Sequence, residues 1–156
     1  MRTSWMRHML VAAAAGLLVC SALPVHAQER RFGAGIILGE PTGLSAKLWV
    51  GEKAAVDAAV AWSFQGDGAF YLHASYLYHF FNLEPTLPDS FSAYVGGGGK
   101  IVFRKDTELG LRIPVGLSYM LSEVPLEAFL EIAPGILLIP GTDADIGGGI
   151  GIRYYF

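Results

Sequence analysis

The segment LHASY puts a histidine and a serine two residues apart, at His73 and Ser75. In a strand this spacing places both side chains on one face, so a base would lie beside a hydroxyl nucleophile. Hydrolytic chemistry also needs an acid that orients the base. The next acid along the chain is Glu84, in a proline-containing segment typical of a turn. The pair is therefore an incomplete catalytic set, and no enzyme is predicted from it.

Two other pairs of residues have spacings that could indicate a glycosidase or a metal site, but neither set is complete. Glu127 and Glu131 lie four residues apart on an expected strand, and basic residues accompany them, which does not suit a glycosidase carboxylate pair. His73 and His79 lack a third ligand at a spacing typical of metal sites. The sequence therefore predicts no metal and no cofactor.

Residues 1–27 have the layout of a secretory signal peptide. Two arginines precede the uncharged run LVAAAAGLLVC, and small residues stand before a cut that we expect between Ala27 and Gln28. The apolar run is shorter than the roughly 20 residues of a membrane-spanning helix. Acylation at Cys20 is the alternative, but Val19 stands where a lipoprotein site has a smaller residue.

The mature chain, residues 28–156, is long enough for one domain. It has no cysteine, and loss of the two leader arginines leaves 9 basic against 14 acidic residues, a net charge of −5. No basic tract offers a surface for nucleic acid. The chain is strongly apolar, yet no apolar run after the leader reaches spanning length, which favours membrane-crossing strands over a helix.

Turn motifs divide the mature chain into eight segments. GEPTG is the first, and its Pro41 and Gly43 suit a tight turn with a glycine at positive φ. The expected strands cover 31–38, 43–50, 54–64, 69–81, 91–104, 108–120, 124–139 and 144–156. Most are close to the roughly 9–11 residues of a tilted membrane strand. We therefore predict an all-β fold, a closed eight-stranded antiparallel up-and-down transmembrane β-barrel over 28–156.

Along each long expected strand, apolar side chains alternate with small or charged ones. Val56, Val60 and Trp62, for example, alternate with Asp57 and with alanines. Aromatic residues on the apolar face gather near strand ends, as they do at membrane interfaces. We therefore expect the apolar face to point outward into lipid. The alternative is an inverted barrel, a soluble periplasmic carrier whose apolar face lines a lipid cavity.

The other face places nearly all strand charges inside the barrel. The inward set is Lys47, Asp57, Lys100, Arg104, Arg112, Glu127, Glu131, Asp145 and Arg153. The turns set three opposed pairs, namely Lys47 with Asp57, Arg104 with Glu108, and Arg112 with Glu131. Because buried charges persist only when they are paired, we predict a lumen plugged by ion pairs. A narrow pore or proton path is the alternative.

The chain ends GIGIRYYF, an alternating run that closes on a phenylalanine. It resembles the last strand of bacterial outer-membrane barrels, which their assembly machinery recognises. The matching residues are Ile150, Ile152, Tyr154 and Phe156. The mature chain is similar in plan to the transmembrane domain of outer membrane protein A, and GEPTGLSAKLW with its flanks resembles a poorly characterised family of small envelope barrels. These resemblances imply an outer-membrane location, with lipid and the assembly machinery as partners.

The expected function is that of a non-enzymatic integral outer-membrane barrel with a structural or binding role. Outer-membrane lipid A deacylases use a His-x-Ser pair with a downstream glutamate, which His73 and Ser75 resemble in part, so a lipid-modifying enzyme is the alternative. Both termini and the long connection 82–90 are expected on the periplasmic side, with short turns outside. This connection is a candidate periplasmic contact, and an envelope or host protein is a further candidate partner of the barrel.

Overall fold

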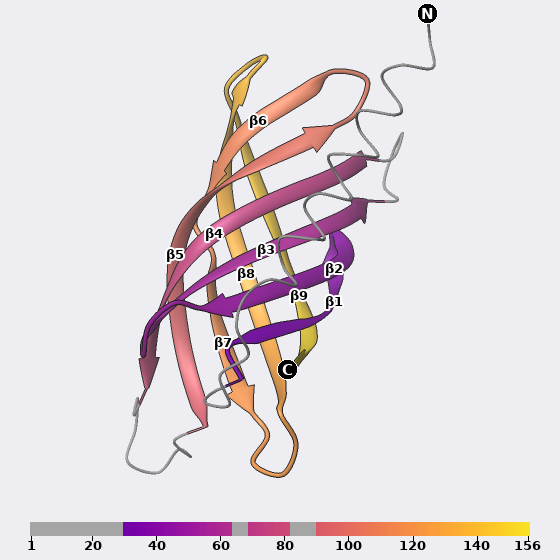
Figure 1. Ribbon diagram of the computed structural model, residues 1–156. Coiled ribbons are helices and arrows are strands. Elements are labelled where there is room, and N and C mark those ends of the chain that lie inside the picture. Colours follow the sequence, from indigo (N-terminus) through magenta and orange to yellow (C-terminus); the bar gives the residue numbers. More distant parts are fainter. Residues whose placement is uncertain (1–29, 64–68, 82–89) are drawn as a thin grey trace, which may run out of the picture.

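The chain forms a ring of antiparallel strands in a computed structural model that describes residues 30–63, 69–81 and 90–156 (Figure 1). The strands are β1 (Phe32–Glu40), β2 (Thr42–Trp49), β3 (Ala54–Ser63), β4 (Ala69–Phe81), β5 (Phe91–Phe103), β6 (Thr107–Arg112), β7 (Val115–Met120), β8 (Leu126–Ile139) and β9 (Asp143–Tyr155). The predicted signal peptide and its cleavage site, the turn at 65–68 and nearly all of the connection 82–90 lie outside the described residues.

The ring is closed. Successive strands pair antiparallel from β1 to β5, β8 pairs with β9, and β9 pairs back with β1. β6 and β7 lie end to end between β5 and β8, so they form two halves of one position in the wall. The wall therefore has eight positions, and the predicted closed eight-stranded up-and-down barrel is confirmed.

The predicted strand 108–120 is interrupted at Ile113 and Pro114. Proline has no N–H to donate to a ladder, so regular pairing stops here. The wall stays joined because Gly96 N donates to the Pro114 carbonyl at 2.8 Å and Ile113 N donates to the Pro134 carbonyl at 2.8 Å. The other described strand ends agree with the expected ones to within two residues.

The GEPTG turn is tighter than expected. β1 continues to Glu40 and β2 begins at Thr42, so Gly43 lies within β2 opposite Ala61. The expectation of a glycine at positive φ is wrong, because neither glycine of this turn adopts one. Glycine is needed at position 43 for space, since a Cβ there would collide with the Val60 carbonyl oxygen and the Ala61 Cα.

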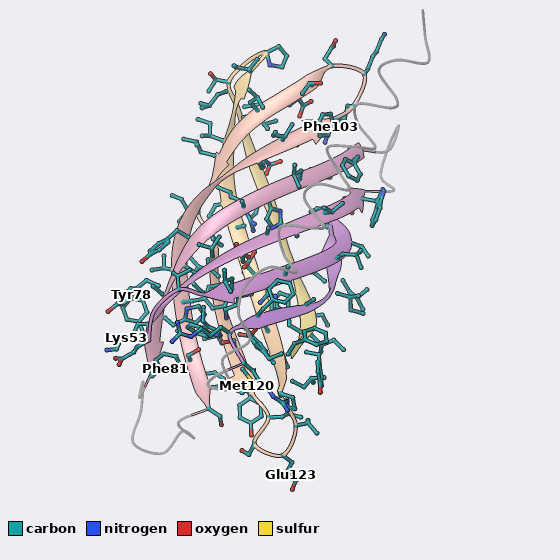
Figure 2. The ribbon with its side chains drawn as sticks, viewed as in Figure 1. Lys53, Tyr78, Phe81, Phe103, Met120 and Glu123 are labelled. Carbon is teal, nitrogen blue, oxygen red and sulfur yellow. The ribbon has the colours of Figure 1, made fainter. Side chains whose placement is uncertain are left out.

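Side chains alternate between the lumen and the outer surface. In β3, Ala55, Asp57 and Ala59 are buried, whereas Val56 and Trp62 are exposed. Every strand places large apolar side chains on the outside in this way (Figure 2). The expected outward direction of the apolar face is confirmed, and the inverted barrel that a soluble carrier requires is contradicted.

Aromatic rings gather at both ends of the outer surface. At one end Trp62, Phe70 and Phe103 lie in a row, with successive ring centroids 5.8 and 5.9 Å apart. The other end has the ring pairs Phe32–Phe156 at 6.4 Å, Tyr154–Phe156 at 5.2 Å and Tyr78–Phe80 at 5.1 Å. Figure 2 shows Phe103 near one end and Tyr78 near the other. Two aromatic girdles thus flank an aliphatic band, as in membrane barrels.

The last residue lies at the same end of the barrel as the start of β1 (Figure 1). Phe156 N donates to the Phe32 carbonyl at 2.9 Å. We call this end the terminal rim; the opposite end, with the turns at 104–106 and 140–142, is the far rim. In the part of the chain that the structure describes, no helix is long and apolar enough to cross a membrane.

Candidate functional site

The lumen holds its charges in two networks, of which the first surrounds Glu127. The Glu127 carboxylate accepts hydrogen bonds from Lys47 Nζ at 2.6 Å, Tyr155 OH at 2.9 Å and Arg153 Nη1 at 3.3 Å. All four side chains are buried almost completely. A buried carboxylate with two cations and a hydroxyl donor is satisfied, so the charge of Glu127 is compensated within the lumen.

Asp57 joins the first network through Arg153. Arg153 Nη2 lies 3.7 Å from Asp57 Oδ2, and Arg153 Nε donates to Ser45 Oγ at 2.9 Å. Lys47 lies opposite Asp57 in the β2–β3 ladder, as the turn between them predicts. Its ammonium group nevertheless pairs with Glu127, on the far side of the lumen. Strand register therefore sets Lys47 opposite Asp57, but the ion pair that Lys47 forms is the one across the lumen with Glu127.

The second network lies nearer the far rim. Arg112 pairs with one oxygen of Glu131, and the other oxygen accepts a hydrogen bond from Tyr94 OH at 2.9 Å. Lys100 pairs with Asp145. Arg112, Glu131 and Lys100 are buried, so these pairs also lie inside the barrel.

The expected opposition of Arg112 and Glu131 is wrong. The ladders set Arg112 opposite Gly135 and Glu131 opposite Gly116. The prediction centred the turn on residues 121 and 122, whereas the observed connection covers 121–125. The Arg112 side chain is long enough to reach Glu131 across this offset in register, so the ion pair forms diagonally.

Arg104 lies in the turn at the far rim, not in the lumen. Glu108 stands opposite Val102, because the turn is centred one residue earlier than expected. Arg104 Nη1 is still 3.5 Å from Glu108 Oε1, and Arg104 Nη2 donates to Tyr71 OH at 3.0 Å. The hydrogen bond with Tyr71 raises the pKa of Arg104 above its ordinary value, which keeps a cation at this rim.

The lumen charges balance. The cations are Lys47, Lys100, Arg112 and Arg153, and the anions are Asp57, Glu127, Glu131 and Asp145. A cavity of about 50 Å³ lies beside Lys100 and Arg112. A water molecule occupies about 30 Å³ in the liquid, so this cavity has room for one or two waters. The arrangement can plug a barrel, and it leaves little space for a conducting path.

Six uncharged side chains that contact these charges are absent from the predicted set, namely Ser45, Trp49, His79, Tyr94, Phe129 and Tyr155. Lys47 Nζ lies 2.9 Å from His79 Nε2 and 4.4 Å from the Trp49 ring centre. Strand parity would have found all six. Five lie an even number of residues from an expected inward residue on the same strand, and His79 shares its strand face with His73 and Ser75.

His73 and Ser75 do not form a catalytic pair. Ser75 lies opposite Asp57, and its buried Oγ has no hydrogen-bond partner. His73 lies opposite Ala59 and lines the small cavity beside Lys100. Both therefore belong to the charged interior of the barrel, and the nucleophile has no base.

Glu127 and Glu131 belong to separate networks. Four residues along a strand place them roughly 13 Å apart, beyond the spacing of glycosidase carboxylates. Among the described residues no group of three or more His, Cys, Asp or Glu side chains is placed to hold a metal ion.

The four residues of the expected assembly motif project from the outer surface of β9 and the residue after it. They are Ile150, Ile152, Tyr154 and Phe156, all exposed. β9 closes the ring against β1, with Ile152 opposite Ile36. Recognition of these residues by the assembly machinery stays a prediction.

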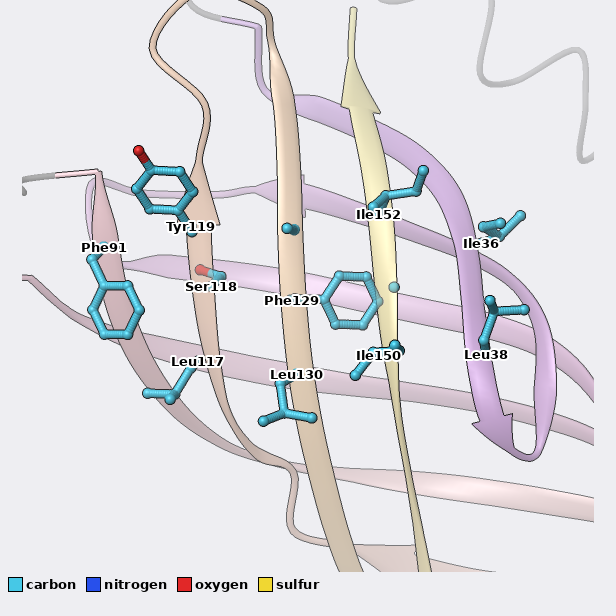
Figure 3. Close-up of a pocket in the computed structure, with 12 residues that line it drawn as sticks. Ile36, Leu38, Phe91, Leu117, Ser118, Tyr119, Phe129, Leu130, Ile150 and Ile152 are labelled. Carbon is cyan, nitrogen blue, oxygen red and sulfur yellow. The ribbon is translucent and has the colours of Figure 1, made fainter.

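The outer wall carries a shallow hollow of about 520 Å³ over β1, β9, β8 and β7 (Figure 3). Its lining is almost wholly apolar and includes Leu38, Leu117, Leu130 and Ile150. In Figure 3 these four side chains lie in a row across β7, β8, β9 and β1. The hollow thus offers apolar contacts to a hydrocarbon chain in contact with the wall.

Comparison with solved structures identifies the fold. The N-terminal β-barrel domain of Pseudomonas aeruginosa OprF is similar with a TM-score of 0.61 and 16% sequence identity, over 81% of this chain and 96% of that chain. This chain has the fold of a small outer-membrane β-barrel. The structure of Neisserial surface protein A (NspA) matches with a TM-score of 0.48 and 14% identity, over 81% of this chain and 95% of that one. No protein-family model and no curated protein matches the chain.

Proposed function

We propose that this chain is an integral outer-membrane barrel with a structural or binding role and no catalytic activity. The observation that carries the proposal is the outer wall, an aliphatic band between the girdle at Trp62, Phe70 and Phe103 and the girdle at the terminal rim. Such a wall suits hydrocarbon flanked by two interfaces. Closure of the ring also leaves no open sheet edge along the β1–β9 seam, as a lipid-exposed sheet requires.

The two lumen networks support a plugged interior. Glu127 and Glu131 each receive at least two donors, and the cations of the lumen equal the anions in number. An ion that crossed the barrel would have to displace these contacts. We therefore assign the networks a structural role.

The proposed partners follow from the two surfaces. The outer wall and its hollow contact membrane lipid, and the last strand, ending at Tyr154 and Phe156, engages the barrel assembly machinery. Export delivers the N-terminus to the periplasm, so the terminal rim faces the periplasm. The connection 82–90 follows β4 and precedes β5 at that rim, which makes it a candidate periplasmic contact. An envelope or host protein remains a further class of partner.

Fractionation of expressing cells tests the location. We expect the protein in the outer-membrane fraction, and we expect unboiled and boiled samples to migrate differently on a gel, because a closed barrel resists detergent. A variant that cannot close, Gly43→Ala, provides the control that should lose the difference. Recovery of the wild-type protein from the soluble periplasmic fraction would overturn the proposal.

The lipid-modifying enzyme is tested in the same cells. Ser75 lacks a base, so we expect the mass of lipid A to be the same with and without the protein. A mass change that disappears in the His73→Ala variant, while Ser92→Ala retains it, would contradict the absence of catalysis.

A further inference from the structure

The paired part of the β1–β9 seam ends before β9 does. The last pair of this ladder joins Glu40 to Gly148, whereas residues 143–147 of β9 have only β8 beside them. Pro41 turns the chain toward β2 at this point, and a proline has no N–H with which to extend the ladder. Figure 1 shows the β8–β9 hairpin extending beyond the turn that joins β1 to β2. One edge of β9 is therefore open at the far rim.

This open edge of β9 presents unpaired backbone groups. Phe156 N donates toward β1, and Tyr155 N donates toward β8. Successive residues of a strand direct their backbone groups to opposite sides, so the even-numbered residues of β9 face β1. Beyond the last pair these residues are Ile146 and Ala144. Their N–H and C=O groups bond to no other described residue.

The open edge is a template for one more strand, because its free N–H and C=O groups recur at alternate residues. Unpaired backbone does not persist in hydrocarbon, so this edge belongs on the water side of the membrane interface. We propose that the open edge of β9 binds an extended polypeptide segment in which basic and apolar side chains alternate. The inference names a partner class for the binding role proposed above, and it rests on that role. With the terminal rim in the periplasm, the segment comes from outside the cell.

The acids beside the open edge select the charge of the segment. Asp143 is exposed, and Glu40 has a buried carboxylate oxygen without a hydrogen-bond partner. Neither acid has an ion pair with another described residue, whereas Asp145 is paired with Lys100. The exposed cations of the far rim lie in the turn at 104–106, which β6 and β8 separate from β9. The charge left at the edge is therefore negative, which favours a basic segment.

The outward side chains of the edge favour an apolar neighbour. Ile146 is 72% exposed, more than any other large apolar side chain among the described residues. Ala144 is small and also exposed, so an apolar side chain of an added strand has room to pack beside Ile146. A second copy of this chain fits less well. Antiparallel pairing of residue 144 with residue 146 of the copy would set Asp145 opposite the same residue of the copy, and like charges directly opposite are destabilising.

Amide hydrogen exchange tests the edge residue by residue. The probe is the peptide Ac-KVKVKVK-NH2, added to isotope-labelled mature protein in nonionic detergent and followed by NMR. In the free protein we expect the N–H groups of Ala144 and Ile146 to exchange quickly, and that of Asp145, which faces β8, to exchange slowly. The peptide should slow exchange at Ala144 and Ile146 roughly tenfold or more by pairing with them, and less so as salt rises. The acidic peptide Ac-EVEVEVE-NH2 should leave both rates unchanged.

Three variants locate the contacts. Ala144→Pro removes an N–H that faces the open side and no bond to β8, and proline is tolerated on edge strands. It should weaken peptide binding, followed at Ile146, about tenfold while the heat-dependent gel shift is retained. Ala144→Val keeps the N–H and should bind normally. Asp143→Asn should weaken binding about threefold, as expected for an exposed ion pair, and Glu123→Gln at the terminal rim should have no effect.

Three results would overturn the inference. The first is exchange at Ala144 and Ile146 that the lysine peptide does not slow, and the second is slowing that Ala144→Pro does not weaken. The third is protection without peptide that grows with protein concentration, which would assign the edge to a second copy. The gel shift of the same samples separates these failures from failure of the barrel proposal. A heat-shifted protein whose edge stays unprotected would refute strand addition alone.

Discussion

Replacing Glu127 with glutamine should destabilise the barrel more than replacing the rim acid Glu108. Glu127 Oε1 accepts from Lys47, and Oε2 accepts from Arg153 and Tyr155. The glutamine side chain has one oxygen and one NH₂ group, so in either orientation the NH₂ group points at one of these donors. The cluster also gains an unbalanced positive charge, because the carboxylate is lost. Breaking a buried pair from one side costs about 3–5 kcal/mol, and we expect a loss of this size.

The assay is urea unfolding of the purified barrel in detergent micelles, followed by tryptophan emission and by the gel shift. The Glu127→Gln variant combined with Lys47→Met removes both charges and leaves Arg153 with Asp57, 3.7 Å away. We expect this double variant to recover roughly half of the loss or more, because paired removal leaves no buried charge uncompensated.

Glu108→Gln is the matched control. It removes the acid of a pair whose arginine is 46% exposed, so it should cost about 1 kcal/mol or less. The reasoning would be refuted if Glu127→Gln cost no more than Glu108→Gln. Strict additivity of Glu127→Gln and Lys47→Met would refute it as well, because contacting residues of one network should be coupled.

Three further predictions concern space, the outer wall and assembly. Gly43→Ala should abolish the heat-dependent gel shift, whereas Gly97→Ala should retain it, because a Cβ at Gly43 meets backbone and one at Gly97 meets nothing within 4 Å. Ile132→Lys, midway along β8, should cost about 2–4 kcal/mol in urea unfolding from lipid vesicles, against about 0–1 kcal/mol for Ile146→Lys near a strand end; equal losses would contradict a membrane band. Phe156→Ala should lower the amount of folded protein in the outer membrane while leaving refolding in detergent unchanged, and normal levels in cells would count against an assembly role.

Strand parity explains why the residues of the lumen could be predicted. The period of two fixes which side chain faces inward once a strand is recognised, and Asp57, Glu127 and Arg153 all follow it. Parity does not set partners. Those depend on turn length and on which strands meet across the lumen, so Lys47 pairs with Glu127 from β8 and not with Asp57 opposite it.

Local turn chemistry was the least reliable guide. GEPTG contains the residues of a glycine turn, yet β1 and β2 run on until only Pro41 separates them. A ladder that gains pairs by extending into the motif overrides the local preference of Gly43. The turn motif LSE at 121–123 covers only part of the longer connection at 121–125, and the misplaced turn centre moved Arg112 out of register with Glu131.

The placement of charge limits where specific recognition can occur on this molecule. Most lumen charges are buried and ion-paired, so a ligand in the lumen would have to break contacts such as the one between Lys47 and Glu127 at 2.6 Å. The outer wall is apolar and therefore offers little beyond its shape for specific recognition. Among the described residues, exposed charged side chains lie only at the two rims. Of these, the terminal rim adds a cavity large enough for a small molecule, whereas the far rim adds the open edge of β9. A binding role for this barrel therefore centres on its rims.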